Sequence, residues 1–563
     1  MNEARYLQAL HRLQAAAWPA GTPREPHYPH GQQPLGEYLR TWARLKPEAP
    51  ALDFYGHSLA WAELDRLADR CAALLAELGV RPGERVAVFL PNCPQLHVAF
   101  YGILRAGAVY VPVSPLSKAL ELGYQLNDSG AETLLCFDQL LPVVRQVRGE
   151  TPLRRLLATS LSELCPATPS LPPPDMLLAP KLAGDDFIDF LPALEACRGP
   201  VPQHQARLDE VAALNYTGGT TGLPKGCVHT HGDMLYTCAS YLSVANRLEQ
   251  ESVLLNFLPE FWIAGENGGL LFPVFAGCRL VLLARWDAEA FMAAVQRYRV
   301  SHCTLLVDSA AEVLEHPRVG EFDFSSLRVS GAISFIKKLT PSYRRRWREL
   351  TGTTLVETSF GMTETHTCDT FIVGFQQDDF DLNSAPTFVG LPVPGTDFKV
   401  CDFETGELLP LGAEGELCIR SPSLLKGYWN RPEASAEVLR DGWLHTGDLG
   451  QITEQGFIRY LGRRKEMIKV NGMSVFPSEL EALLGQHPAV LASAVLARPD
   501  ERRGQQPVAF VVLKPGAGES AESLLAWCRE AMAVYKVPEV RVVASLPMTA
   551  TGKIKKNELE PLL

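Results

Sequence analysis

The segment Asn215-Tyr-Thr-Gly-Gly-Thr-Thr-Gly-Leu-Pro-Lys-Gly226 gathers the residues best suited to binding an anion. Its glycines let backbone N–H groups turn toward an anion without interference from a Cβ atom. Its threonines add hydroxyl donors, and Lys225 adds a mobile positive charge. The segment is not a Walker A loop, because that motif requires Gly-Lys-Ser/Thr, whereas Lys225 lies between Pro224 and Gly226. The pattern therefore predicts a phosphate-binding loop outside the P-loop class.

Further motifs follow this loop in the sequence. They are Phe360-Gly-Met-Thr-Glu364, His445-Thr-Gly-Asp448, Gly462-Arg463 and Pro547-Met-Thr-Ala-Thr-Gly-Lys553. Taken singly, Glu364 fits the first turn of a helix, Asp448 a turn and Arg463 a solvated surface. The ordered set resembles the adenylate-forming superfamily of acyl-CoA synthetases, aryl-acid ligases, luciferases and the adenylation domains of peptide synthetases. The resemblance runs from about Leu35 to the C-terminus.

The resemblance implies a phosphate and metal site made of neutral donors, one cation and one carboxylate. The residues that would hold the β- and γ-phosphates are Thr217, Gly218, Thr220, Thr221 and Lys225. Thr363 is implied as a contact of the α-phosphate. Glu364 is implied as the ligand of Mg²⁺, a hard cation that bridges carboxylate and phosphate oxygens.

The nucleoside end of ATP is implied to lie against other residues. Gly331 and Ala332 match the segment that lies along the adenine in the superfamily. Phe360 stands where the family usually has Tyr, so an aromatic face remains for stacking while the phenolic hydroxyl is missing. Asp448 resembles the ribose ligand, since a carboxylate can accept hydrogen bonds from both hydroxyls. Arg463 would add a fixed charge near the ribose and the phosphates.

The implied reaction has two steps. A carboxylate oxygen attacks the α-phosphorus of ATP, which yields an acyl-adenylate and pyrophosphate. The thiol of coenzyme A then attacks the adenylate carbonyl and releases AMP. A carboxylate is ionised near neutral pH, so the first step needs positioning and charge neutralisation and no general base. By resemblance, the catalytic residues are Lys225, Thr363, Glu364 and Lys553.

Lys553 matches the superfamily lysine that enters the active site from a mobile C-terminal domain. It would contact the carboxylate and the α-phosphate and stabilise charge in the transition state. A basic tail is usually a solvated surface, and Lys555 and Lys556 are expected to face solvent. Lys465 falls at the hinge position of the family, where Asp or Lys is typical. After the domain rotates, Gly472 would let the pantetheine arm of coenzyme A approach closely.

The residues implied around the acid are less diagnostic. Trp262 stands where many members have His, in the segment whose aromatic residue guards the acid pocket, and it fits a plain core position almost as well. The acyl tunnel of the family would pass Asn267, Gly268 and Gly269, where glycines leave room for a chain, and then Asp308. Asp308 is unusual there and would either face solvent or select a polar group.

Three functions therefore stay open from the sequence. The first is a fatty or related carboxylic acid–CoA ligase, because the Tyr-Thr-Gly-Gly-Thr-Thr-Gly form of the loop resembles bacterial fatty acyl-CoA ligases. The second is an aryl-acid–CoA ligase or a stand-alone activator that loads a carrier protein. The third is a non-catalytic nucleotide-binding sensor, which is disfavoured because Lys225, Glu364, Asp448 and Lys553 are all present.

Composition narrows the setting of this chemistry. The net charge of −11 disfavours nucleic acid as a partner. The sequence contains no apolar run of about 18 residues, so it predicts no transmembrane helix. Its cysteines are scattered without a C-x-x-C pair, which is typical of reduced thiols in a cytoplasmic protein. Tyr6, Leu7, Leu10 and Leu13 have helical spacing, which favours packing on the protein's own surface over a membrane-surface helix. The oligomeric state is not readable.

The elements that position these motifs follow from apolar periodicity. Residues 61–78 and 96–106 read as helices and residues 85–90 and 109–113 as strands, which predicts βα units around a mainly parallel sheet. After Gly390 short strands and Gly/Pro turns predict a β-rich region over about 390–461. Ser478-Glu-Leu-Glu481 resembles a capping box that opens a helix. An α/β fold is expected, with an N-terminal domain at 1–464 and a small mobile α+β domain at 465–563.

Overall fold

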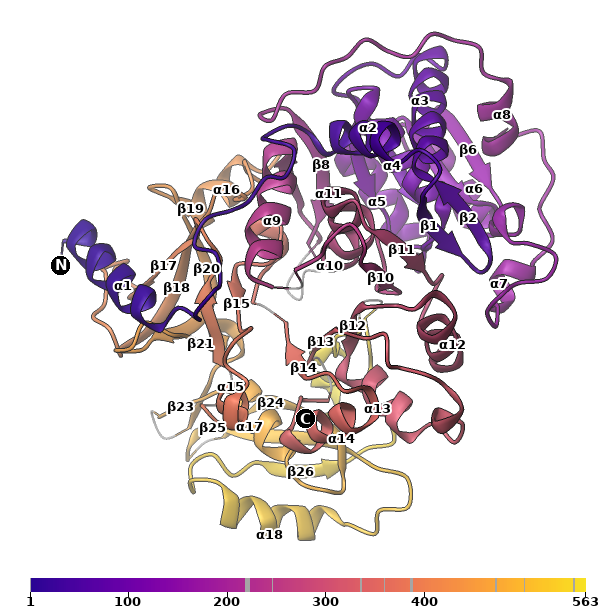
Figure 1. The fold of residues 1–563 in the computed structure, drawn as a ribbon. Helices are drawn as coiled ribbons and strands as arrows, with labels where there is room; N and C mark the ends of the chain where they lie inside the picture. Colours follow the sequence, from indigo (N-terminus) through magenta and orange to yellow (C-terminus); the bar gives the residue numbers. More distant parts are fainter. Residues whose placement is uncertain are drawn as a thin grey trace.

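The computed structural model describes residues 2–217, 223–245, 247–334, 337–358, 360–384, 388–470, 473–500, 502–549 and 552–563. It confirms the expected α/β fold, in which two mainly parallel sheets are followed by a β-rich part and a small α+β part (Figure 1). Within the described residues, no helix combines the length and apolar character that crossing a bilayer requires.

The first sheet is parallel except for the hairpin that ends it. Its order is β7 (Ile188–Asp189), β6 (Arg155–Thr159), β5 (Thr133–Phe137), β3 (Arg85–Phe89), β4 (Val109–Pro112), β8 (Val211–Tyr216) and β9 (Gly226–Thr230). The strands are almost wholly apolar because parallel strands are covered on both faces. The antiparallel β8–β9 pair carries the predicted phosphate loop at its tip.

The second sheet is also parallel apart from its last pair. Its order is β14 (Leu355–Glu357), β13 (Val329–Ile333), β12 (His302–Leu306), β10 (Val253–Asn256), β11 (Arg279–Leu282), β1 (Pro50–Phe54) and β2 (His57–Ala60). The start of the chain thus completes a sheet whose other strands come some 200 residues later. The helices that flank this sheet later in the chain are α12 (Ala288–Tyr298), α13 (Val307–Glu315) and α14 (Pro341–Thr351).

One continuous apolar core joins the two sheets through shared helices. Every residue of α4 (Pro94–Arg105) is buried, and α9 (His231–Val244) is buried almost as completely. A helix that is apolar all round can only be accommodated in an interior. The other helices of these layers are α2 (Leu35–Leu45), α3 (Trp61–Glu77), α5 (Ala119–Ser129), α6 (Leu141–Val147), α7 (Asp175–Leu178), α8 (Phe190–Ala196), α10 (Ile263–Glu266) and α11 (Phe272–Ala276).

The β-rich part forms an antiparallel sheet, as the turn-rich sequence predicts. Its order is β15 (Thr370–Phe371), β16 (Phe388–Pro392), β21 (Ile458–Arg463), β20 (Trp443–Ile452), β18 (Glu414–Arg420) and β17 (Asp397–Cys401), with β19 (Leu439–Arg440) beside β20. The short helices α15 (Phe380–Asn383) and α16 (Pro432–Val438) flank it. The chain leaves this sheet through a single 3₁₀ turn, η8 (Arg464–Glu466).

The last part has its own sheet and its own apolar core. Its order is β23 (Met473–Val475), β22 (Ile468–Val470), β25 (Gly504–Leu513) and β24 (Val490–Asp500), with β26 (Glu539–Val542) parallel to β25. Its helices are α17 (Pro477–Leu484) and α18 (Ala521–Ala531). In Figure 1 this part is drawn in orange to yellow below the rest of the molecule.

The N-terminal helix α1 (Glu3–Ala17) lies beside β17 and β18, far along the sequence from its own position (Figure 1). Tyr6, Leu7 and Leu10 are buried in the apolar cluster of that sheet. The Glu3 carboxylate lies 2.6 Å from Lys399 Nζ and fixes the start of the helix. The amphipathic segment therefore packs on the protein's own surface, as its spacing predicts.

The predicted capping box at Ser478 is wrong. Helix α17 begins one residue earlier, with Pro477 in its first turn and no side-chain cap at Phe476. The Ser478 hydroxyl instead donates to the Leu461 carbonyl at 2.8 Å, and Glu481 accepts from the Val495 N–H at 2.9 Å. Proline is favoured at a first helical position because the N–H that it lacks would have no intrahelical partner there. Pro477 therefore sets the start of the helix, and the Ser478–Glu481 capping box does not form.

Candidate active site

One large cleft is lined by residues from all parts of the chain. The predicted site residues that line it are Thr217, Lys225, Trp262, Asn267, Gly268, Phe360, Thr363, Glu364, Asp448, Arg463, Lys465 and Lys553. These residues are separated by up to 336 positions in the sequence, so only the fold brings them together. Gly218, Thr220, Thr221 and Gly472 lie outside the described residues.

The two ends of the phosphate loop are tied together by its outermost predicted residues. The Thr217 N–H donates to the Lys225 carbonyl at 2.9 Å, and the Lys225 N–H donates to Thr217 Oγ1 at 3.2 Å. This closes the neck of the β8–β9 hairpin. The Lys225 ammonium lies 4.6 Å from the centre of the Tyr428 ring, a cation–π contact that places the charge at the cleft.

Thr363 and Glu364 lie on a short 3₁₀ turn, η6 (Thr363–Thr365), that other segments hold in place. The His229 ring nitrogen Nε2 lies 2.7 Å from the Thr363 carbonyl oxygen. The Tyr428 hydroxyl donates to Glu364 Oε1 at 2.8 Å. Glu364 is half-buried at the cleft, and its hard carboxylate oxygens fit a Mg²⁺ ion that keeps part of its coordination for phosphate and water.

Asp448 and Arg463 form a pair across neighbouring strands. They stand opposite each other on β20 and β21, and Arg463 Nε lies 3.0 Å from Asp448 Oδ1. Burial raises the pKa of the Asp448 carboxyl to about 6, although the positive charge of Arg463 opposes that shift. The same pairing raises the pKa of the Arg463 guanidinium. A carboxylate fixed at the cleft in this way can accept hydrogen bonds from the two hydroxyls of a diol.

Lys553 is carried into the cleft by a tight turn of the C-terminal part. The Thr549 N–H donates to the Lys553 carbonyl at 2.6 Å, and Met548 bridges Ile554. Surrounding protein atoms and then the charge of Arg463 lower the pKa of the Lys553 ammonium, while Asp448 and Glu364 act in the opposite direction. Lys553 is therefore close enough to Arg463, Asp448 and Glu364 for their charges to shift its pKa.

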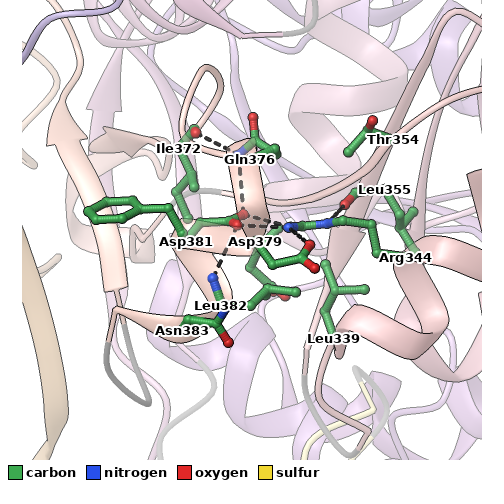
Figure 2. A network of polar contacts seen from close by, with 12 residues as sticks. Leu339, Arg344, Thr354, Leu355, Ile372, Gln376, Asp379, Asp381, Leu382 and Asn383 are labelled. Carbon is green, nitrogen blue, oxygen red and sulfur yellow. Dashed lines mark hydrogen bonds and ion pairs between the residues drawn. The ribbon is translucent and has the colours of Figure 1, made fainter.

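A buried arginine fixes one wall of the cleft (Figure 2). Arg344 on α14 binds both Asp381 oxygens at 2.8 and 2.6 Å and Asp379 Oδ1 at 2.7 Å. Its Nε donates to the Leu355 carbonyl at 3.0 Å. Gln376 Nε2 adds a bond to Asp381 at 3.2 Å. Asp381, Leu382 and Asn383 line the cleft, so this network positions its wall.

Between Tyr241 and Phe272, the residues that line the cleft are mostly apolar. The described apolar residues that line it there are Tyr241, Leu254, Leu255, Leu258, Phe261, Ile263 and Phe272. Asn256 and Asn267 also line it, and Asn267 Nδ2 donates to the His366 carbonyl at 3.1 Å. Asn267 begins a π-helical stretch, η4 (Asn267–Leu271), and such widened turns recur at functional sites.

Gly269 does not widen this pocket. A Cβ atom at Gly269 would come 1.7 Å from Glu260 Oε1, whereas one at Gly268 would meet only Asn256 at 3.4 Å. Gly269 is therefore a glycine because the buried Glu260 carboxylate packs against it, and the expectation that it leaves room for an acyl chain is wrong.

Other predicted residues are displaced from the expected positions. Asp308 is not among the described residues that line the cleft; its Oδ2 accepts from the Lys337 N–H at 3.2 Å, and burial raises its pKa. Gly331 and Ala332 are buried inside β13, and Ile333 and Ser334 reach the cleft in their place.

Lys556 does not face solvent, contrary to the expectation for the basic tail. Its ammonium lies 3.0 Å from Glu466 Oε2 and 2.9 Å from Glu481 Oε1 instead of facing solvent. Lys555 is half-buried, and its ammonium lies 3.0 Å from Glu558 Oε1. Lys556 thus ties the basic tail to the start of the C-terminal part, near the turn that contains Lys465.

Two residues at the site were not found from the sequence. Tyr428 contacts both Lys225 and Glu364, and His229 supports Thr363. Tyr428 lies 64 positions from Glu364, so no local spacing connects them. The local sequence feature that could have pointed to Tyr428 is its place directly after Gly427, whose φ of 139° favours glycine.

Comparison with known proteins agrees with this geometry. The model of the AMP-binding enzyme family matches residues 39–429, and that of the AMP-binding enzyme C-terminal domain matches residues 479–553. A long-chain-fatty-acid–CoA ligase of Bacillus subtilis is 32% identical over 97% of this chain and 97% of its own. The 4-coumarate–CoA ligase 2 of Oryza sativa is 32% identical over 94% of this chain and 92% of its own.

A solved structure shows the same architecture. An anthranilate CoA ligase in complex with anthranoyl-AMP superposes with a TM-score of 0.82 at 27% identity and covers 94% of this chain and 97% of its own. Both family models, the full-length relatives and the cleft geometry point the same way. The chain therefore belongs to the AMP-binding enzyme family, within the adenylate-forming superfamily that its motifs resemble.

Proposed function

We propose that this chain is an AMP-forming ligase that activates a fatty or related aliphatic acid with ATP and transfers it to coenzyme A. The observation that carries the proposal is the meeting of Lys225, Glu364, Asp448, Arg463 and Lys553 at one cleft. Two lysines and one arginine supply positive charge for anionic substrates, while one carboxylate is available for a metal and the other for the ribose. ATP and coenzyme A are the expected substrates of the family to which the chain belongs.

In the first step the residues of the cleft would bring two anions together. Lys225 would hold the phosphates that leave, and Lys553 would lie between the attacking carboxylate and the α-phosphate. Asp448 would accept from the ribose hydroxyls and keep the nucleotide in register with Thr363. This arrangement lowers the barrier by orientation and by charge neutralisation, which are the main demands of transfer at a phosphorus.

Mg²⁺ is proposed as the metal of this reaction. Glu364 would hold it, with its carboxylate orientation set by the Tyr428 hydroxyl. When bound, the ion would supply positive charge to neutralise the triphosphate and the leaving pyrophosphate.

The acid is proposed to occupy the apolar part of the cleft beside Trp262. Leu254, Leu255 and Phe272 present apolar surface there, which favours an aliphatic chain. The relative from Bacillus subtilis is named a long-chain-fatty-acid–CoA ligase. An aryl acid is the second candidate, because Asn256 and Asn267 add amide groups to the same wall and could bind a ring substituent.

The chain is proposed to work as two domains, 1–464 and 465–563. Residues 465 onward have their own sheet and core, and η8 with Lys465 is the only turn between β21 and β22. Rotation at Lys465 would withdraw Lys553 after adenylation and bring the segment around Gly472 to the cleft for thiol attack. All 13 cysteines are free thiols, which supports a reducing, cytoplasmic setting.

A panel of acids tests this proposal. Purified protein would be given Mg·ATP with octanoate, palmitate, benzoate or 4-coumarate, and both ATP–pyrophosphate exchange and loss of free coenzyme A thiol would be followed. The proposal expects both signals, with the highest kcat/KM for an aliphatic acid. A preference for 4-coumarate would favour the aryl-acid reading. Exchange without thiol loss would indicate a carrier-protein activator, and no exchange with any acid would indicate a nucleotide sensor.

A further inference from the structure

Four side chains with metal-binding chemistry gather on one face of the β-rich sheet, next to the turn that carries Asp448. Cys401 on β17 stands opposite Glu416 on β18, and Cys418 on β18 stands opposite His445 on β20. Directly opposed residues of antiparallel strands point to the same face. The set therefore combines two thiols, one imidazole and one carboxylate from three adjacent strands.

Three of these side chains already have metal-like spacing. His445 Nδ1 lies 3.5 Å from Cys418 Sγ and 2.7 Å from Glu416 Oε2. One ligand atom from each of the three residues falls within 4.8 Å of the others. A tetrahedral zinc ion places nitrogen and sulfur ligands about 3.5 Å apart, so the His445–Cys418 separation fits, and the His445–Glu416 contact would widen by about 0.7 Å.

Cys401 is the fourth residue of the cluster. Its side chain lies on the same face of the sheet as that of Cys418, and neither cysteine forms a disulfide. Because Cys401 faces Glu416, it is diagonal to Cys418, and diagonal Cα atoms lie about 7–8 Å apart, beyond the usual disulfide range. A metal ion placed between the two sulfur atoms tolerates this separation better than a direct S–S bond does.

Helix α1 covers this cluster. The buried Tyr6 hydroxyl has no hydrogen-bond partner within the described parts of the chain, and Tyr6 belongs to the same buried cluster as Cys401. A metal-bound thiolate would be an acceptor for this orphaned donor. Lys399 stands opposite Cys418 and adds a positive charge beside the thiols.

The Glu416 carboxylate of the cluster also accepts a hydrogen bond from the backbone. Glu416 Oε1 accepts from the Gly447 N–H at 2.9 Å while Oε2 faces His445. Metal-binding carboxylates are usually oriented by such outer contacts. The contact joins the cluster to the His445–Asp448 turn, whose aspartate is the proposed ribose ligand.

We propose that Cys401, Cys418, Glu416 and His445 form a four-coordinate Zn²⁺ site that fixes the turn carrying Asp448. Thiolate and imidazole ligands favour zinc and disfavour Mg²⁺, so this site is chemically distinct from the one at Glu364. Four protein ligands leave no open position, and the site therefore has a structural role.

Cobalt substitution tests the site without any assay of activity. Reduced, chelator-treated protein would be titrated anaerobically with Co²⁺ in the absence of ATP and Mg²⁺. We expect a thiolate-to-cobalt charge-transfer band and the strong visible bands of tetrahedral cobalt, saturating at one equivalent and bleached by Zn²⁺. Cys418→Ser and Cys401→Ser should each weaken Co²⁺ binding by at least the roughly 10–100-fold that loss of an outer-shell partner costs.

Cys303→Ser is the matched control, because Cys303 is also buried but lies on β12 in another sheet. It should bind Co²⁺ like the wild type. The proposal is overturned if the wild type shows no charge-transfer band, or if Cys418→Ser binds Co²⁺ as tightly as the wild type does. Should a serine variant fail to fold, alkylation of the wild type decides: Zn²⁺ must slow modification of Cys401 and Cys418 relative to Cys165, and equal rates with and without Zn²⁺ contradict the site.

Discussion

At the scale of single residues, Asp448 shows how the fold sets the chemistry of the cleft. Its carboxyl is 2% exposed, and burial raises its pKa to about 6 even though Arg463 lies 3.0 Å away. The carboxyl is therefore mostly ionised at pH 7 and loses its charge as the pH falls through 6. Its ability to bind the nucleotide should depend on pH in the range where an ordinary aspartate is fully ionised.

We predict that ATP binding weakens as the pH falls through 6. The pKa of Asp448 is raised to about 6, so the carboxyl is protonated below that pH and loses one acceptor for the ribose hydroxyls. If only the ionised form accepts both hydroxyls, the ATP Kd rises up to about tenfold per pH unit below the pKa. Calorimetric titration with Mg·ATP from pH 5 to 8, without acid substrate, measures this dependence.

Asp448→Asn is the control for that titration. It binds ATP more weakly at every pH but keeps only the pH dependence that arises from the terminal phosphate of ATP itself. Subtracting the two profiles isolates Asp448. Identical profiles for both proteins would show that the Asp448 carboxyl does not titrate in contact with the nucleotide.

The sequence predicted which residue types face the cleft better than it predicted where strands end. Lys225 was found from the residue types of its loop, whereas Glu364 and Lys553 were found because their motifs resemble those of the adenylate-forming superfamily. Asp308 was wrongly expected near the acyl tunnel, because its carboxylate accepts a hydrogen bond from the Lys337 N–H, which lies outside its helix. Tyr428 was missed because its partners lie far away in the sequence, and no local pattern encodes such a contact.

At the scale of elements, the Arg344 network holds α14 against the segment that ends in α15 (Figure 2). Arg344 is 2% exposed, and its partner Asp381 is 5% exposed. Removing one member of a buried ion pair leaves the other charge without compensation. The network therefore should matter for stability and for the shape of the cleft wall.

We predict that Arg344→Leu destabilises the folded state by about 3–5 kcal/mol, because the buried Asp381 would keep its charge without its arginine partner. The thermal unfolding midpoint of the purified protein measures the effect. Arg345→Leu on the exposed side of the same helix is the control and should change stability by no more than about 0.5 kcal/mol. Equal midpoints for the two variants would refute the structural role of the network.

Elements were predictable where apolar periodicity was strong. The helices expected at 61–78 and 96–106 are α3 and α4, and the strands expected at 85–90 and 109–113 are β3 and β4, with boundaries shifted by one or two residues. Strand order was not predictable, because β1 pairs with β11, whose partner residues lie more than 200 positions away. Which strands pair depends on contacts between residues far apart in the sequence, and a local pattern does not predict such contacts.

At the scale of the whole molecule, the account requires the part from Lys465 onward to move. We predict that Lys465→Pro slows steady-state acyl-CoA formation several-fold while single-turnover adenylate formation changes less. Proline fixes φ near −65° and removes a backbone donor, so a rotation through this residue is restricted. Rapid-quench measurement of both half-reactions separates the two rates.

Lys465→Ala is the matched control, since it removes the side chain and leaves the backbone free to turn. It should keep both rates close to those of the wild type. If Lys465→Pro also turns over at the wild-type rate, the hinge lies elsewhere and the proposed domain boundary at 465 is wrong.

The central claim is that Lys553 belongs to the cleft in the first half-reaction only. Lys553→Ala should reduce acid-dependent ATP–pyrophosphate exchange to background, yet it should convert a supplied acyl-adenylate and coenzyme A to acyl-CoA at close to the wild-type rate. Lys555→Ala, at the neighbouring lysine that pairs with Glu558, should leave both reactions intact. Equal loss of both half-reactions in Lys553→Ala, or exchange that survives the substitution, would contradict the account.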